Sequence, residues 1–171
     1  MLVGVLSDSH DNLVALREVL QRILEHNVEK VIHLGDIISP FTVKLMKEVL
    51  KDTPVIAVRG NNDGDVYQLT TLFAKYNWVF FSEPTVIEIS GKRILLFHGY
   101  GSPENTRKLV YALTNSLDID VLLYGHTHLV DAERVHGKLV LNPGEVCGYI
   151  TNRKSYALLD LDKLKAEIHF V

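Results

Sequence analysis

Five short motifs in this chain offer side chains that bind divalent metal ions, and each motif directly follows a short apolar run. Imidazole, carboxylate and amide groups are the nitrogen and oxygen ligands that hold such ions in proteins. Because separate segments supply these groups, we predict a site assembled from several loops. The candidate ligands, in chain order, are Asp8, His10, Asp36, Asn61, His98, His126 and His128.

The residue types predict a pair of metals. Two divalent ions about 3.5 to 4 Å apart need a bridging carboxylate, neutral imidazoles, and open positions for water and phosphate. Asp36 is the natural bridge because the two oxygens of a carboxylate can span two cations. The expected ligands are Asp8, His10 and His128 for one metal, and Asn61, His98 and His126 for the other.

The apolar runs before the motifs indicate how the ligands come together. The runs are residues 3–6, 31–34, 55–58, 94–97 and 121–124. If they are strands of one sheet, all the ligands emerge at one edge, outside the carboxyl ends of the strands, where open α/β sheets bind ligands. A lone histidine is more often structural than a metal ligand, so the prediction rests on the joint arrangement.

The order of the motifs resembles that of the calcineurin-like metallophosphoesterases. The matching segments are Asp-x-His at 8–10, Gly-Asp at 35–36, Gly-Asn-x-Asp at 60–63, His-Gly at 98–99 and Gly-His-x-His at 125–128. The compact chain, residues 60–63 and residues 142–145 resemble the small archaeal and bacterial phosphodiesterase branch. The resemblance implies an α/β fold, an αββα four-layer sandwich of two mixed β-sheets flanked by helices.

The same resemblance implies an activity and a cofactor. We expect hydrolysis of a small phosphodiester by a hydroxide that bridges two divalent metal ions, with Asp36, Asn61 and Asn62 as the catalytic residues. The ligand set suits Mn²⁺, Fe²⁺, Ni²⁺, Co²⁺ or Zn²⁺, and the family favours Mn²⁺ or Ni²⁺.

One position departs from the family pattern. Many members carry a histidine where this chain has Asn62, and that histidine contacts the phosphate and can protonate the leaving oxygen. An amide can orient a phosphoryl oxygen but has no proton to give at neutral pH. Either another group or a metal-bound water supplies the proton, or the enzyme favours leaving groups that depart without much help.

Residues beside the motifs invite more modest interpretations. Asp11, Asn12 and Asp63 are candidates to accept the outer N–H of a metal-bound imidazole. Glu145 is expected to be an exposed carboxylate on a turn at 142–144, with orientation of an imidazole as the alternative. Three further residues complete the set: His33 as a core or sheet residue, Cys147 as a small buried apolar residue, and Arg59 either on a phosphate or pointing away.

The remaining pattern alternates helices and strands. Helical spacing predicts helices over 13–24 with Asp11 or Asn12 as cap, from Ser39-Pro40 to Leu50, over 66–76, and from Ser102-Pro103 to about 117. Hairpins are predicted where 86–89 meets 94–97, 132–135 meets 139–141, and 156–161 meets 164–171.

Composition indicates a soluble, cytoplasmic enzyme. The chain has 171 residues, is 47% hydrophobic and carries a formal charge of −3, which favours one domain over 1–171. Scattered basic residues predict no extended nucleic-acid surface and argue against a nuclease. No signal peptide or long apolar stretch is visible, so no membrane partner is expected.

Two further questions stay open in the sequence. An aromatic cluster of Tyr76, Trp78, Phe80 and Phe81 suits either a homo-oligomer interface or a sheet edge. The same fold also serves as a protein-binding module in a subunit of the retromer sorting coat, which has lost part of the metal constellation. The intact set of seven ligands favours the enzyme over that alternative.

Overall fold

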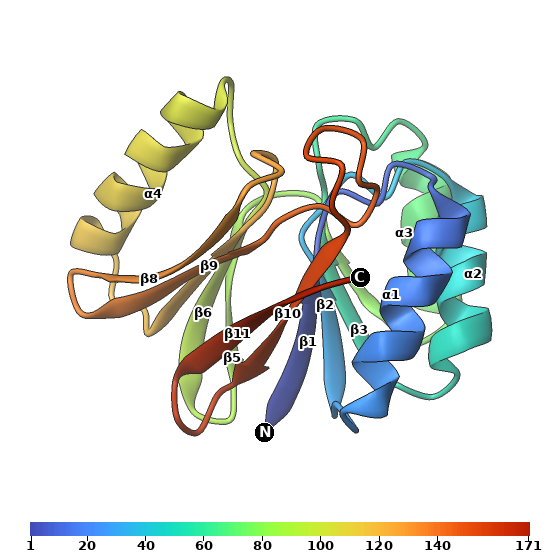
Figure 1. Cartoon of the computed structure of the whole chain (residues 1–171), viewed down its shortest axis with the longest axis horizontal. Coiled ribbons are helices and arrows are strands. Elements are labelled where there is room, and N and C mark those ends of the chain that lie inside the picture. The colour runs from blue at the N-terminus through green and yellow to red at the C-terminus, as the bar shows by residue number, and fades with distance from the viewer.

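The computed structural model describes residues 1–171 and places two β-sheets between two layers of helices (Figure 1). The helices are α1 (Leu13–Glu25), α2 (Pro40–Leu50), α3 (Val66–Lys75) and α4 (Pro103–Ser116). The strands are β1 (Leu2–Leu6), β2 (Lys30–His33), β3 (Val55–Val58), β4 (Val79–Phe81), β5 (Thr85–Ile89), β6 (Lys92–Phe97), β7 (Val121–Tyr124), β8 (Val130–Val135), β9 (Lys138–Pro143), β10 (Ser155–Asp160) and β11 (Lys165–Phe170).

Both sheets are mixed. The first has the order β11-β10-β1-β2-β3-β4 and the second β5-β6-β7-β9-β8. Strands β1 to β4 run parallel to one another, as do β6, β7 and β9, whereas β10, β11, β5 and β8 pair antiparallel. The αββα sandwich predicted from the motifs is therefore confirmed.

Three apolar clusters hold the four layers together. One joins α1, α2 and α3 to the outer face of the first sheet, and includes Leu16, Met46 and Phe73. A second fills the space between the sheets, and a third packs α4 against the outer face of the second sheet. Each sheet is thus buried on both faces, which explains why its central strands read as continuous apolar runs.

The helices begin where the sequence predicts, because polar side chains cap them. Asn12 Oδ1 accepts a hydrogen bond from Ala15 N and begins α1, which decides between the two possible caps. Ser39 and Ser102 cap α2 and α4, each followed by proline at the first helical position. Asp65 caps α3.

The five strands that precede the motifs divide between the two sheets, so the premise of a single sheet was wrong. Strands β1, β2 and β3 belong to the first sheet, and β6 and β7 to the second. The ligands still share one edge, because both parallel sets point the same way and the sheets pack face to face. In Figure 1 the N-terminus is at the bottom and this edge is at the top.

The aromatic cluster is largely a sheet edge. Trp78 is buried in the first apolar cluster, Tyr76 and Phe80 pack against it, and Phe81 packs against the cluster between the sheets. Residues 79–81 form β4, a short edge strand that the helical pattern before Trp78 does not announce.

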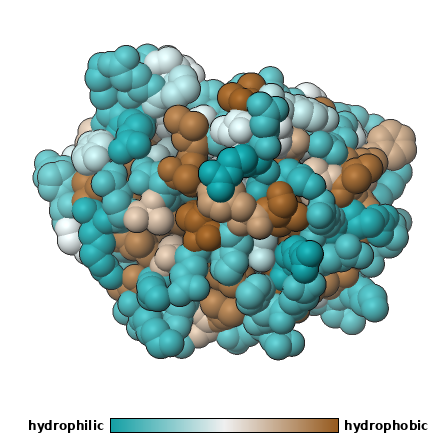
Figure 2. All heavy atoms as spheres, in the orientation of Figure 1, coloured by the Kyte–Doolittle hydropathy of each residue, from teal (hydrophilic) through white to brown (hydrophobic).

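The outer surface is mostly polar. Figure 2 shows hydrophilic side chains over most of one face, with hydrophobic groups mainly near its middle. None of the four helices is both long enough and apolar enough to span a bilayer.

Candidate metal centre

The loops that carry the candidate ligands are held in an unusual backbone conformation. Five of the seven residues have positive φ, although none is glycine: Asp8 (54°), His10 (44°), Asp36 (56°), His126 (68°) and His128 (60°). Such conformations cost about 1 to 3 kcal/mol each and persist where the surroundings impose them, often at functional sites. The fold therefore holds these side chains in place in spite of an unfavourable backbone conformation.

Motif glycines allow the loops to approach each other. A Cβ on Gly60 would overlap the backbone nitrogen and Oδ1 of Asp36, and one on Gly125 would overlap the Ser7 hydroxyl. Neither position has room for a side chain. The glycines thus fix how closely the loops after β2 and β3, and those after β1 and β7, come together.

One group of ligands gathers between β1, β2 and β7. His10 Nε2 lies 3.3 Å from Asp36 Oδ2 and 3.8 Å from Asp8 Oδ1. His128 Nε2 lies 3.5 Å from the same Asp8 oxygen. The rings of His10 and His128 stack with centroids 5.2 Å apart.

The other group gathers around Asn61. Its Oδ1 lies 3.0 Å from His98 Nε2 and 2.8 Å from His126 Nδ1. His98 Nε2 is also 3.5 Å from Asp36 Oδ1. Asp36 therefore faces both groups, one with each oxygen, as expected of a bridging carboxylate.

Outer partners fix which nitrogen of three imidazoles carries the proton. His98 Nδ1 is 2.6 Å from the Leu34 carbonyl oxygen, and His126 Nε2 is 2.6 Å from that of Gly101. His128 Nδ1 is 2.7 Å from Glu145 Oε2. Each outer nitrogen must donate, so in a neutral ring the inner nitrogen presents a lone pair.

These lone pairs meet oxygen atoms that also lack protons. An imidazole lone pair and a carbonyl or carboxylate oxygen at about 3 Å repel one another unless a cation lies between them or the ring is protonated. In addition, Asp8 Oδ1 and His10 Nε2 are buried without any hydrogen-bond partner. The donor set therefore fits divalent metal ions.

The electrostatics of the site agree with this interpretation. Burial alone would raise the pKa of Asp36, but the hydrogen bonds and charge of His98 and the hydrogen bonds of Asn62 hold it well below its usual range. The nearby Asp8 carboxylate, followed by the charge of Asp36, raises the pKa of His10, although burial opposes the rise. Burial opposes a similar rise for His98, but Asp36 and Asp8 raise its pKa overall. The carboxylates thus favour positive charge at this place, as expected where cations bind.

Asn62 forms two hydrogen bonds with Asp36. Its backbone nitrogen donates to Asp36 Oδ1 at 2.8 Å, and its side-chain Nδ2 donates to Oδ2 at 2.7 Å. The side chain is exposed, and an amide nitrogen carries two protons. One N–H therefore remains for a group that arrives from solvent.

Glu145 was expected to be exposed, and that expectation was wrong. The residue is fully buried. Besides His128, its oxygens accept hydrogen bonds from Cys147 Sγ and from the backbone of Ile150 and Thr151. These hydrogen bonds outweigh burial, which would raise the pKa of Glu145, and lower it to about 2. A buried carboxylate needs such partners, and a glutamate beside a turn gives no sequence signal of them.

Asp11, Asn12 and Asp63 contact no imidazole, contrary to expectation. Asp11 accepts hydrogen bonds from the hydroxyls of Ser39 and Thr42. Asn12 caps α1 and donates to the Cys147 carbonyl. Asp63 accepts from Ile38 N and Gly60 N, both at 2.7 Å. These side chains instead form hydrogen bonds with backbone and hydroxyl groups in the loops, while His98, His126 and His128 have carbonyl and Glu145 partners.

Three other predictions concern residues behind the ligands. His33 is a buried sheet residue, as predicted, and its Nε2 lies 3.0 Å from the Ser9 hydroxyl. Cys147 is buried, as predicted, and burial followed by the Glu145 hydrogen bond raises the pKa of its thiol to about 12. Asn142 is the penultimate residue of β9, and its buried amide donates to Gly125 O and Thr127 Oγ1, both at 3.0 Å.

Asn142 lies in the segment 142–144, which the sequence predicts to be a turn. Its two hydrogen bonds hold the loop that carries His126 and His128. The composition of 142–144 gave a turn signal, whereas the strand continues to Pro143. Only the pairing of β9 with β7 and β8 places the amide under that loop.

Comparison with known proteins identifies the class that the fold and this site define. Residues 1–164 match the calcineurin-like phosphoesterase superfamily domain. The chain belongs to this superfamily of metal-dependent hydrolases of phosphoric esters.

The similar proteins include archaeal and bacterial phosphodiesterases. A phosphodiesterase of Methanocaldococcus jannaschii is 35% identical over 164 residues, covering 95% of each chain. The phosphodiesterase YfcE of Escherichia coli is 32% identical, covering 92% of this chain and 86% of YfcE. A solved archaeal phosphodiesterase superposes with a TM-score of 0.88 at 33% identity, covering 100% of both chains.

A protein that is not named a phosphodiesterase has a similar fold. Vps29 of Chaetomium thermophilum superposes with a TM-score of 0.71, covering 100% of this chain and 92% of its own, at 17% identity. That likeness concerns the fold alone.

Proposed function

We propose that this protein is a phosphodiesterase that uses two divalent metal ions per chain and acts on small phosphodiesters. The observation that carries the proposal is the set of three imidazoles whose outer N–H groups are already engaged, and whose inner nitrogens face Asp8, Asp36 and Asn61. By resemblance to the family, Mn²⁺ or Ni²⁺ is the proposed metal, and the absence of a thiolate among the proposed ligands removes the main signal for zinc alone.

The division of ligands follows the two groups of side chains. Asp8, His10 and His128 would hold one metal, Asn61, His98 and His126 the other, and Asp36 both. Two bound cations would lower the pKa of a water molecule from near 16 towards about 7, which supplies hydroxide at neutral pH. The protein contributes fixed positions for the ligands, which reduces reorganisation during the reaction.

Asn62 supports a preference for diesters. Its free N–H can donate to a phosphoryl oxygen, but the amide cannot protonate a leaving oxygen. The other ionisable side chains at the site are proposed metal ligands, so none of them is free to act as an acid once metals are bound. Substrates whose leaving group departs without a proton are therefore favoured.

The test compares two chromogenic esters on protein stripped of metal and reloaded with Mn²⁺ or Ni²⁺. We expect metal-dependent hydrolysis of bis-p-nitrophenyl phosphate and much slower hydrolysis of p-nitrophenyl phosphate. In Asp36→Ala, which removes a ligand from both metals, we expect metal content below two ions per chain and turnover reduced by at least about 100-fold, beyond typical outer-shell effects.

The other outcomes would each contradict a part of the proposal. Equal hydrolysis of both esters would contradict the preference for diesters. Retention of two metals and of activity in Asp36→Ala would refute its bridging role. Absence of turnover with two metals bound would favour a binding module on the same fold.

A further inference from the structure

A cavity of about 300 Å³ opens beside the second group of ligands. It lies at the seam between the two sheets, where the loop after β3 meets the end of β4 and the end of β6. Asn61 and His98 form its inner side, and Phe97 and Pro84 contribute apolar surface. Its volume is at the lower end of the range for small-molecule sites.

Arg59 is the one fully charged side chain in the lining, and it has no partner. Its guanidinium makes no hydrogen bond and no ion pair, although its backbone nitrogen donates to the Phe81 carbonyl at 2.8 Å. The side chain is exposed, and the Ser82 hydroxyl lines the same cavity. The sequence left open whether Arg59 points towards a ligand or away, and in the structure Arg59 is one of the residues that line this cavity.

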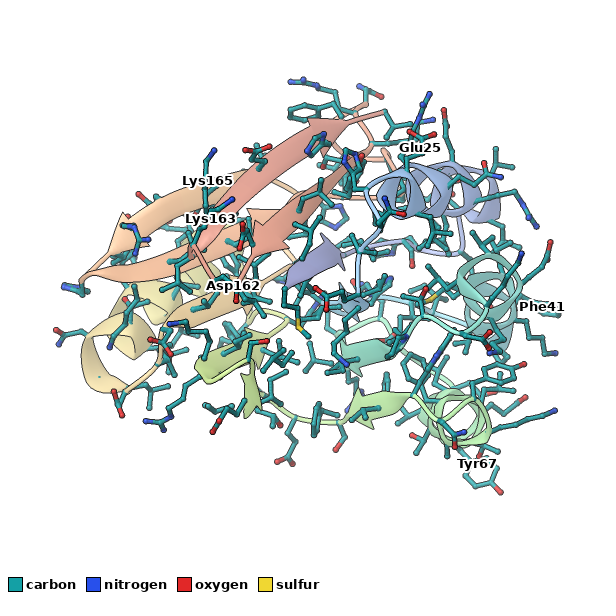
Figure 3. All side chains as sticks on the ribbon, turned by 90° about the horizontal axis from the view of Figure 1, so that it is seen from below. Glu25, Phe41, Tyr67, Asp162, Lys163 and Lys165 are labelled. Carbon is teal, nitrogen blue, oxygen red and sulfur yellow. The ribbon has the colours of Figure 1, made fainter.

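A cavity at the opposite end of the molecule provides a contrast. It has a similar volume of about 310 Å³ and two lysines, but Lys163 Nζ is 3.2 Å from Asp160 Oδ2 and Lys165 Nζ is 2.8 Å from Glu167 Oε1. Figure 3 looks onto this end and shows Lys163 and Lys165 near the turn between β10 and β11. Those cations are neutralised by neighbours, whereas Arg59 is not.

We propose that the Arg59 cavity binds an anionic substituent on the non-leaving arm of the substrate, so that the preferred substrates are phosphodiesters bearing a further carboxylate or phosphate. The guanidinium offers two parallel N–H donors to such a group, and Ser82 offers a hydroxyl. This inference rests on the proposed function, because it assumes that the scissile phosphate sits at Asn61 and His98.

The reaction that tests the proposal releases a coloured product. Water and p-nitrophenyl 3-carboxypropyl phosphate give p-nitrophenol and 3-carboxypropyl phosphate, with cleavage of the bond between phosphorus and the nitrophenyl oxygen. The matched substrate carries a 3-carbamoylpropyl arm, which has nearly the same shape but no charge. We expect kcat/KM to be about tenfold higher for the substrate with the carboxylate arm. This factor is at the low end of what a hydrogen bond to a charged group contributes, because Arg59 is exposed.

Arg59→Gln should remove the preference by slowing the acid to the rate of the amide, with the amide itself unchanged. Arg59→Lys should restore part of the preference, since it keeps the charge but not the planar pair of donors. Arg22→Gln, at the far end of α1, is the matched control and should behave as the parent protein. Equal slowing of both substrates by Arg59→Gln would place Arg59 at the scissile phosphate and overturn the inference.

A binding measurement separates this inference from the proposed function. The full chain, with and without Zn²⁺, is titrated with 3-carboxypropyl methyl phosphate while the backbone amide signals of Ser82 and Gly99 are followed by NMR. We expect these signals to shift, and Arg59→Gln to need about tenfold more ligand. If the parent protein and Arg59→Gln need the same ligand concentration, the inference is overturned even when turnover is observed. If the signals shift as expected but no turnover is observed, only the proposed phosphodiesterase activity is refuted.

Discussion

Three of the four candidate imidazole ligands are oriented by the partner of the outer nitrogen. Two of these partners are backbone carbonyls, which no side-chain substitution removes, but His128 depends on Glu145 at 2.7 Å. Outer partners of this kind typically contribute 10–100-fold to metal affinity or activity. Mutation of Glu145 therefore tests the positioning of His128 without removing a proposed metal ligand.

We predict that Glu145→Gln weakens metal binding about 10–100-fold. The amide keeps one oxygen for His128, but it loses the charge and turns an N–H₂ group towards the donors of Ile150 and Thr151. Competition with a chelator measures the dissociation constants. Glu88→Gln, an exposed position on β5, is the control, and unchanged affinity in Glu145→Gln would exclude the positioning role.

At the scale of elements, the strand-end loops must approach within van der Waals contact. Gly60 and Gly64 belong to the same loop after β3, but they differ in surroundings. A Cβ at Gly60 would overlap Asp36, whereas a Cβ at Gly64 would meet nothing within 4 Å, and Gly64 has no positive φ. The same substitution by alanine at Gly60 and at Gly64 therefore tests how closely the loops pack.

We predict that Gly60→Ala displaces Asp36 and lowers metal content and turnover, and that Gly64→Ala leaves both unchanged. A displacement of about 1 Å can cost around 100-fold in rate. Elemental analysis and the bis-p-nitrophenyl phosphate assay measure the two quantities. Full metal content in Gly60→Ala would show that the loops have room to separate.

At the scale of the whole molecule, buried His33 couples folding to pH. Burial lowers the pKa of His33 to about 4, so the folded protein keeps it neutral where the unfolded chain, with a pKa near 6.5, takes up a proton. The unfolded state binds more protons across this window, so the free energy of unfolding falls as the pH drops from 6.5 to 4. The full contribution is about 3 kcal/mol.

The raised pKa values of His10 and His98 affect stability above pH 6.5, and the lowered pKa values of Asp36 and Glu145 reduce it below their usual values of 3.8 and 4.5. Burial raises the pKa of Asp63, which opposes part of the decline inside the window. Urea unfolding of metal-free protein should therefore show a decline between pH 6.5 and 4 that is much smaller in His33→Gln and persists in His136→Gln. A decline of the same size in His33→Gln would assign the effect to another group.

Local sequence signals were sufficient for most elements. Asn12, Ser39-Pro40 and Ser102-Pro103 begin helices because a side-chain acceptor beside a run of helical spacing acts within a few residues. The order of the motifs was also sufficient to predict the family, because each candidate ligand follows an apolar run, as expected of ligands at strand ends. Strand β4 was not predicted, because an edge strand of three residues is too short to show a recognisable hydrophobic pattern.

The sequence by itself determined which residue types are available for chemistry, where the helices begin and which strands precede the ligands. Only the tertiary structure decided that β1, β2 and β3 lie in one sheet and β6 and β7 in another, that Glu145 is buried behind His128, and that Asn142 supports the loop after β7. The physical reason is range: capping and periodicity act between neighbours in the chain, whereas burial and hydrogen bonding between distant segments depend on how the sheets pack.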